Sequence, residues 1–178
     1  MKTIARKWLV LFILAVCMCA FSAPHTVQAA SCKKAAVKNV TVRKKGGKYF
    51  GYRRNGSKLK KKWAVVSKKN RKYYYYFGRN GEAYTGVHAI GTNWTNTKLY
   101  VFSSKGRLDL KKTKALEKLS ASKSDVSKLL SRIGKYDRKN TFKKKTACGV
   151  TFYVYRNAFT VYILEEKGKE LVDYVEAN

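Results

Sequence analysis

Aromatic rings and lysines recur in short blocks between residues 47 and 110, and together they suggest one kind of chemistry. The densest block, Arg71 to Gly86, reads RKYYYYFGRNGEAYTG and places five consecutive rings after two cations. A tyrosine ring has an apolar face and a polar tip, so it can stack on a sugar while its hydroxyl stays hydrated. A lysine ammonium neutralises phosphates or uronates. The combination favours recognition of an anionic polymer or glycan.

The residues expected to bind are taken from these blocks. The ring set consists of Tyr49, Tyr52, Trp63, Tyr74, Tyr75, Phe77, Trp94, Tyr100 and Phe102. The polyanion-binding set consists of Lys60, Lys61, Lys62, Lys68, Lys69, Arg71 and Lys72. A single basic run is also typical of a solvated face, but the excess of positive charge over the whole chain is too large to serve solubility alone.

The sequence offers no set of residues typical of catalysis or metal binding. His88 is the only histidine after residue 29, and no Ser-His-Asp or Cys-His-Asp arrangement can be assembled around it. We interpret His88 as a ring of the repeats. Cys32, Cys148 and one histidine fall short of the four close ligands of a zinc site. The acids at residues 165–170 are interpreted as a solvated turn. We therefore predict a non-enzymatic protein with no catalytic residues, metal or cofactor.

The rings belong to a repeat of 25 residues. Asn55-Gly56, Asn80-Gly81 and Lys105-Gly106 are evenly spaced, and an aromatic residue stands four positions before each glycine. Alternating aromatics suit a β-strand, and Asn-Gly is a strong turn signal. The pattern predicts stacked β-hairpins, with residues 73–77 as the first strand of the middle one. On that strand Tyr73, Tyr75 and Phe77 should face one way, and Tyr74 and Tyr76 the other.

Residues 47–110 resemble the cell-wall-binding (choline-binding-like) repeats of Gram-positive surface proteins. The best match is Lys72 to Val87, where Thr85-Gly86-Val87 stands at the family's Gly-Trp position; Lys62-Trp63 holds that place in the first unit. The resemblance implies a hairpin solenoid whose aromatic clefts hold a ligand, choline on teichoic acid in the best-known members. A choline cage needs several rings, and the Gly-Trp position keeps its tryptophan only at Trp63. We therefore expect a polyanion or glycan instead.

The second half of the chain has a different pattern. Helical spacing covers Thr113 to Leu119 and Asp125 to Ile133, with Ser122 or Ser124 as a cap of the second helix and Gly134 at its end. Three strands are expected at Thr151–Tyr155, Ala158–Leu164 and Glu170–Val175, with a hairpin turn at residues 166–169. This part loosely resembles small exported modules of the β-lactamase-inhibitor-like type, which implies a binding or scaffolding domain.

The predicted fold is mainly β with an α+β C-terminal part: stacked β-hairpin repeats followed by a small helix-plus-antiparallel-meander domain. The expected divisions are a signal peptide (1–29), a basic N-terminal segment (30–46), the β-hairpin repeat region (47–112) and a small α+β domain (113–178).

The start of the chain predicts export. Lys2, Arg6 and Lys7 precede a run of apolar residues at 8–21 that is short for a membrane span, and small residues favour cleavage before Ala30. An uncleaved anchor and a lipid on Cys17 are the alternatives. The formal net charge is +30, and the signal carries three bases and no acid, so cleavage leaves +27. In an exported chain the remaining cysteines favour a Cys32–Cys148 disulfide, with two unpaired thiols as the alternative.

These observations predict a secreted, cell-surface or cell-wall-associated cationic protein that binds an anionic cell-wall polymer or glycan through its aromatic repeats. The alternative function is a secreted effector or inhibitor whose C-terminal domain binds another protein, with the repeats as a surface-targeting tag. A cationic membrane-active or nucleic-acid-binding protein is a third hypothesis. Because counterion release makes any polycation bind nucleic acid, we expect that binding to be non-specific.

Overall fold

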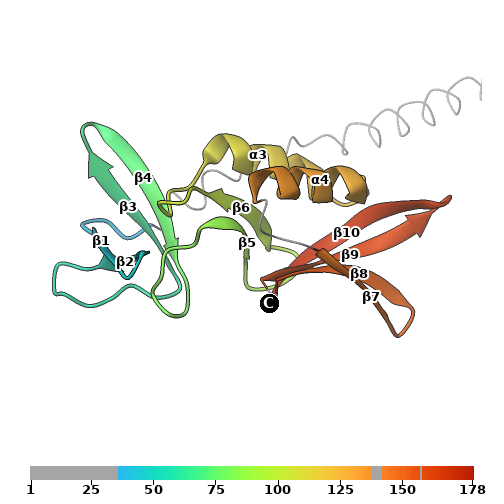
Figure 1. The fold of residues 1–178 in the computed structure, drawn as a ribbon, viewed down its shortest axis with the longest axis horizontal. Coiled ribbons are helices and arrows are strands. Elements are labelled where there is room, and N and C mark those ends of the chain that lie inside the picture. Colours follow the sequence, from blue (N-terminus) through green and yellow to red (C-terminus); the bar gives the residue numbers. More distant parts are fainter. Residues whose placement is uncertain (1–35, 138–141, 157) are drawn as a thin grey trace, which may run out of the picture. The chain divides into compact units, whose positions relative to one another are not determined.

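The computed structural model describes residues 36–137, 142–156 and 158–178. The predicted signal peptide and Cys32 lie outside the described residues. The described part is mainly β, with three two-stranded hairpins, two short helices and one four-stranded antiparallel sheet (Figure 1). The predicted fold class, hairpins followed by a helix-plus-meander part, is confirmed.

Three antiparallel hairpins follow one another in the first half of the chain. β1 (Thr41–Lys45) pairs with β2 (Lys48–Tyr52), β3 (Lys62–Lys68) with β4 (Arg71–Phe77), and β5 (Gly86–Ile90) with β6 (Lys98–Phe102). Each pair forms its own two-stranded sheet. Because an isolated hairpin is only marginally stable in water, each must gain stability from its neighbours.

The five rings of residues 73–77 lie on the second strand of the middle hairpin, so their predicted place on the first strand is wrong. The chain reverses at Lys69 and Asn70, which both take positive φ (48° and 58°). Two such residues form a turn whose twist matches that of the flanking strands. The partner strand is β3, which places Val65 opposite Tyr74.

The Asn-Gly and Lys-Gly dipeptides form the turn that follows each aromatic strand. In all three turns only the glycine has positive φ, and its amide donates to the carbonyl three residues earlier. These hydrogen bonds measure 3.0 Å for Gly56, 3.0 Å for Gly81 and 2.8 Å for Gly106. A single β-bridge closes each turn; the bridges join Tyr52 to Lys58, Phe77 to Ala83, and Phe102 to Leu108. The 25-residue repeat is therefore present in the backbone, with Tyr52, Phe77 and Phe102 at equivalent positions.

Hydrogen bonds between backbone groups also join successive repeats. The amide of Ala83 donates to the carbonyl of Tyr49 at 2.8 Å, and 25 residues later the amide of Leu108 donates to the carbonyl of Tyr74 at 2.8 Å. The turn that ends one repeat thus lies against the aromatic strand of the repeat before it.

The second half begins with helices α3 (Leu110–Leu119) and α4 (Val126–Tyr136), which lie beside the third hairpin (Figure 1). Asp109 and Asp125 cap them by accepting from the amides of Lys112 and Lys128. The predicted serine cap of α4 is therefore wrong, and α4 continues past Gly134. A carboxylate at this position also interacts favourably with the helix dipole.

The last sheet has the order β10-β9-β8-β7. Its strands are β7 (Phe142–Ala147), β8 (Val150–Tyr155), β9 (Phe159–Glu166) and β10 (Lys169–Ala177). The three predicted strands and the turn at Lys167-Gly168 are present. The edge strand β7 was not predicted, because its three consecutive lysines give no alternation of apolar and polar residues. Exposed lysines are typical of edge strands, where they oppose pairing with other chains.

Two clusters of buried side chains stabilise the fold. The first packs Val40, Leu59 and Ala64 around Tyr75 and Phe77 of β4. The second joins the third hairpin to the helices and to the last sheet; its buried members are Val87, Ala89, Leu99, Val101, Leu116, Val126, Leu129, Ile133, Tyr155, Phe159, Val161, Ile163, Val172 and Val175. The third hairpin thus shares one core with residues 113–178. Whether residues 113–178 form a domain of their own stays a prediction.

Candidate functional site

The nine rings predicted to bind ligand differ in their burial. Tyr75, Phe77, Tyr100 and Phe102 are each at most 6% exposed, so their rings pack inside the protein and offer no open face to a ligand. The half-buried members are Tyr49, Tyr52, Trp63 and Tyr74. Trp94 is 60% exposed. Any binding by the ring set must therefore use these last five.

The two faces of β4 divide its rings as the alternation predicts. Tyr75 and Phe77 point into the first core cluster, with Tyr73 packed against it. Tyr76 lies on the other face, where its ring centroid is 5.2 Å from that of Trp63 on β3. Tyr74 shares the second face and lines a groove at the surface. One face of β4 thus packs into the core, and the other face places its rings nearer the surface.

A cluster of rings joins the second hairpin to the third. The ring centroid of Trp63 lies 5.0 Å from that of Tyr100 and 5.9 Å from that of Phe102. Tyr84 stacks on His88 with a centroid distance of 3.9 Å. The ring centroid of Tyr84 is also 5.1 Å from that of Tyr76, so Tyr84 contacts rings on both sides of the cluster. The position of His88 agrees with its interpretation as a repeat ring. Tyr84 was not predicted, although it follows the Asn80-Gly81 turn that returns the chain to the aromatic strand.

Burial changes the acid–base properties of this ring cluster. It lowers the pKa of His88 below its usual value, an effect partly offset by the Thr85 carbonyl 3.0 Å from Nε2. Because a carbonyl can only accept, Nε2 carries the proton and donates. Burial also raises the pKa of Tyr76 and of Tyr84. A neutral imidazole that stacks on Tyr84 and lies edge-on to Phe102 is a packing element between hairpins.

Several other rings are covered by the chain's own cations. The guanidinium of Arg107 lies 4.1 Å from the centroid of Tyr73, and its Nε donates to the Tyr75 hydroxyl at 3.3 Å. The ammonium of Lys58 lies 4.5 Å from the centroid of Phe50. Such contacts stabilise the repeats by roughly 0.5–1 kcal/mol each at exposed sites. They also occupy ring faces that a ligand would otherwise use.

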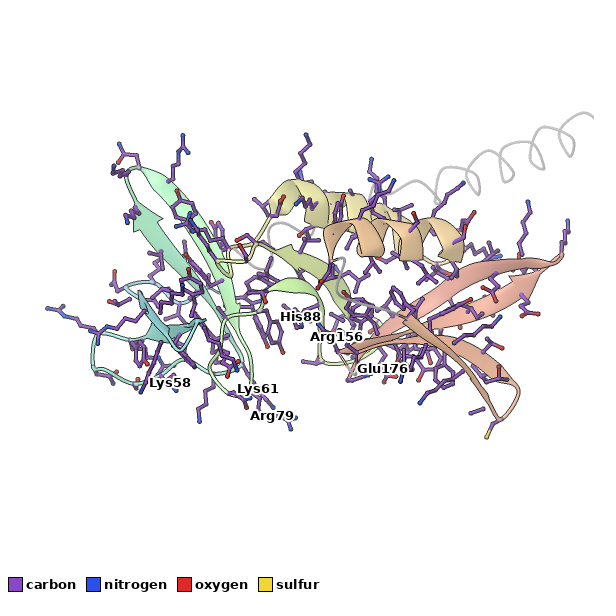
Figure 2. All side chains as sticks on the ribbon, viewed as in Figure 1. Lys58, Lys61, Arg79, His88, Arg156 and Glu176 are labelled. Atoms are coloured by element: carbon purple, nitrogen blue, oxygen red, sulfur yellow. The ribbon has the colours of Figure 1, made fainter. Side chains whose placement is uncertain are left out.

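The predicted polyanion-binding residues are all exposed and lie at the two ends of the middle hairpin. Lys68 pairs across the strands with Arg71 beside the Lys69-Asn70 turn. At the opposite end Lys61 joins Lys58 and Arg79, near the point where the amide of Lys61 donates to the carbonyl of Gly78 (Figure 2). Within the described ranges none of the seven predicted cations forms an ion pair, so their charge is available to an external anion.

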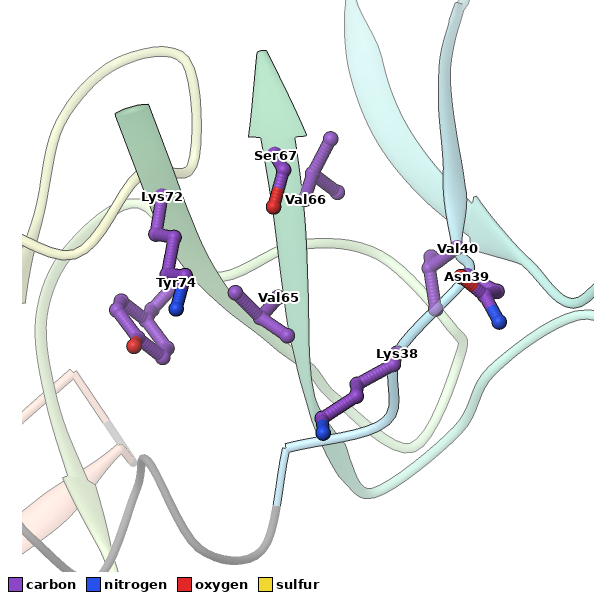
Figure 3. Close-up of a pocket in the computed structure, with 8 residues that line it drawn as sticks. All are labelled: Lys38, Asn39, Val40, Val65, Val66, Ser67, Lys72 and Tyr74. Carbon is purple, nitrogen blue, oxygen red and sulfur yellow. The ribbon is translucent and has the colours of Figure 1, made fainter. Parts of the chain in front are cut away.

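A surface groove of about 680 Å³ combines cations with an open ring. We call it the lysine groove; its lining residues are Lys38, Asn39, Val40, Val65, Val66, Ser67, Lys72 and Tyr74 (Figure 3). Val65 of β3 lies between the Tyr74 ring and the chain segment that carries Lys38 and Asn39 (Figure 3). The groove thus has an apolar floor, one tyrosine ring with its hydroxyl, a serine hydroxyl, an amide and two ammonium groups.

Backbone pairing builds one wall of the lysine groove. The amide of Val37 donates to the carbonyl of Trp63 at 2.8 Å, and the amide of Val65 donates to the carbonyl of Val37 at 3.0 Å. The segment at residues 37–40 therefore runs beside β3, and Asn39 turns it with a φ of 57°. Of the groove residues only Lys72 and Tyr74 were predicted as binding residues. The rest were missed because a pairing between residues 37 and 64 has no local sequence signal.

Three further features bear on the predicted disulfide, on metal binding and on a membrane anchor. Cys148 is exposed in the turn between β7 and β8, while its predicted partner Cys32 lies outside the described residues, so the disulfide stays a prediction. In residues 36–137, 142–156 and 158–178 no group of three or more His, Cys, Asp or Glu residues is arranged to hold a metal ion. No helix among these residues is long and apolar enough to cross a membrane.

Comparison with known proteins gives only weak matches. No family model matches the chain, and no curated protein matches it. Among solved structures it is similar to a multimodular pneumococcal cell wall endolysin from phage Cp-1 complexed with choline, at 12% identity and a TM-score of 0.22, over 79% of this chain and 38% of that chain. It is also similar to the modular Cpl-1 endolysin complexed with a peptidoglycan analogue, at 14% identity and a TM-score of 0.20, over 78% and 38%. The chain thus spans well under half the length of either endolysin.

Proposed function

We propose that this protein is a non-enzymatic, exported binding protein that holds an anionic cell-wall polymer or glycan in the lysine groove. The proposal rests on one observation: the side chains of Lys38 and Lys72 and the ring of Tyr74 line the same groove of about 680 Å³. A polymer of alternating sugars and phosphates, or of uronates, needs both kinds of contact. The ring and the valine floor accept a sugar face, and the ammonium groups neutralise charge.

The surrounding charge supports an anionic partner. The mature chain carries +27 if the signal is removed before Ala30. Lys68, Lys69 and Arg71 extend the positive surface from Lys72 to the tip of the hairpin. A field of this size raises the local concentration of polyanions and the rate at which they associate. The resemblance of the repeats to cell-wall-binding repeats supports the wall as the place where such polymers are met.

The experiment is retention of the mature chain by isolated Gram-positive cell walls at about 0.15 M salt, where contacts between distant exposed charges are already screened. Walls that keep their anionic polymers should retain the protein. Walls from which these polymers have been extracted should retain much less. Equal retention by both preparations, or none by either, would contradict the proposal.

A further inference from the structure

The only strongly exposed tryptophan of the described residues lies outside the lysine groove, on the loop between β5 and β6. Trp94 is 60% exposed. Its ring centroid is 5.7 Å from that of Tyr174 on β10. An exposed indole of this kind is costly to hydrate and is common where a protein binds a partner.

The loop that carries Trp94 is held firmly by its own side chains. The Asn96 carboxamide oxygen accepts from the amide of Thr92 at 2.7 Å, and its nitrogen donates to the Thr92 hydroxyl at 2.8 Å. The Asn93 side chain accepts from the Thr95 hydroxyl at 2.8 Å and from the amide of Asn96 at 3.0 Å. A Cβ at Gly91 would overlap the backbone of Thr97, so the loop can close only with glycine there. Such rigidity reduces the entropy that binding would cost.

Tyr174 continues into a line of rings across the last sheet. Tyr174 stacks on Tyr162 of β9 at 4.4 Å with an interplanar angle of 16°, and Tyr162 lies 5.6 Å from Phe152 of β8. These three residues are direct cross-strand partners, so they share one face of the sheet. None of them belongs to the buried core on the other face. With Trp94 they form a strip of four rings, which we call the ring strip.

Polar groups lie at the Trp94 end of the ring strip. A cavity of about 320 Å³ is lined by Trp94, Thr95, Thr97, Ser120, Ser122, Asp173, Tyr174 and Val175. No lysine or arginine lines it, in a chain of which 40 residues are basic. Within the described part, the side chains of Ser122 and Asp173 make no hydrogen bond or ion pair that would occupy them.

A β-bulge directs Asp173 to this position. Val172 pairs with Ile163 and Tyr174 with Tyr162, so Asp173 is the extra residue on β10. Bulges of this kind re-aim a side chain and are common beside functional sites. The bulge thus places a carboxylate acceptor next to the rings of Trp94 and Tyr174, in a cavity that is also lined by two threonines and two serines.

We infer that this cavity and the ring strip form a second binding site, for an uncharged saccharide chain. A pyranose ring lies against Trp94 and Tyr174, its hydroxyls bond to Asp173 and Ser122, and the chain continues over Tyr162 and Phe152. Rings with carboxylate and hydroxyl partners match a ligand that has apolar faces and hydroxyl edges. The absence of cations from the lining separates this ligand from the anionic polymer of the lysine groove.

The test uses the mature chain and a panel of neutral linear tetrasaccharides of glucose, N-acetylglucosamine, mannose and galactose, followed by NMR at about 0.5 M salt to suppress charge-driven binding. We expect at least one tetrasaccharide to shift the Trp94 indole signal. Trp94→Ala should weaken its binding about tenfold or more, and Asp173→Asn should weaken it less. Trp94 is so exposed that the alanine variant should keep the circular dichroism spectrum of the parent.

The controls distinguish this site from the lysine groove. Tyr74→Ala should leave tetrasaccharide binding unchanged, because Tyr74 lines the lysine groove and not the cavity at Trp94. No binding of any tetrasaccharide, or equal binding by the parent and Trp94→Ala, would overturn the inference. Binding of tetramethylammonium at Trp94 without binding of any saccharide would also overturn it, since it would assign the rings to a cation.

Discussion

Gly51 of the first hairpin lies directly against the ring of Phe77 in the second, and that ring is fully buried. A Cβ at residue 51 would overlap the ring. Phe77 cannot move aside cheaply, because Leu59, Ala64 and Tyr75 surround it in the same core cluster. Because Gly51 has no side chain, the first hairpin can pack directly against Phe77 of the second.

Gly51→Ala should therefore destabilise the protein by about 1–3 kcal/mol, the usual cost of overpacking a core. The measurement is the free energy of unfolding in urea. Gly134→Ala is the matched control: the added methyl group meets nothing within 4 Å in α4. It should stabilise the chain by up to about 1 kcal/mol, because alanine is the better helix former. Equal effects of the two substitutions would show that the repeats do not pack in this register.

Stability should fall on mild acidification because of His88. Burial lowers the pKa of its imidazole in the folded chain, whereas in the unfolded chain the group takes up a proton near about pH 6.5. Below that pH the unfolded state therefore binds more protons, and stability decreases until the folded-state pKa is passed. The loss is at most about 1.4 kcal/mol per pH unit.

Thermal unfolding between pH 7.5 and 5.5 checks this, with His88→Phe as the control. The variant keeps a ring against Tyr84, which stacks on His88 in the parent, but it has no proton to gain. Its melting temperature should vary less over this range than that of the parent. The same pH dependence in both proteins would mean that another group is responsible.

Residues 113–178 should not fold alone. Without the third hairpin this fragment loses Val87, Ala89, Leu99 and Val101 from the core that they share with the helices. A fragment of residues 85–178 keeps them and should unfold cooperatively, as near-ultraviolet circular dichroism during heating would show. Cooperative unfolding of the shorter fragment would support the predicted boundary at residue 112 as a true domain boundary.

The sequence predicts the repeat better than the pairing within it. The 25-residue spacing of Gly56, Gly81 and Gly106 correctly predicts three equivalent turns, because the glycine is the one residue of each turn with positive φ. Residues 73–77 alternate correctly between two faces. Alternation does not say which neighbouring segment pairs with them, however, and the turn signal at Asn80-Gly81 is stronger than that at Lys69-Asn70.

The candidate site was predictable only in part, for a similar reason. Lys72 and Tyr74 follow from their block of rings and cations, but Lys38 joins them only through backbone pairing between Val37 and β3. Burial also removes Tyr75, Phe77, Tyr100 and Phe102 from the ring set, and period-2 alternation alone cannot tell a core face from a ligand face. Trp94 was predicted to bind, but nothing local to it indicates Tyr174 as its neighbour.

The lysine groove, rather than net charge, should hold the anionic polymer. The direct measurement is the affinity of the mature chain for poly(glycerol phosphate) at several salt concentrations. Lys38→Gln/Lys72→Gln removes two charges from the groove, and Lys111→Gln/Lys114→Gln removes two from exposed positions on α3. We predict at least about a tenfold loss of affinity for the groove pair and less than about a twofold loss for the α3 pair. Equal losses for the two pairs would contradict the account, because binding would then depend on total charge alone.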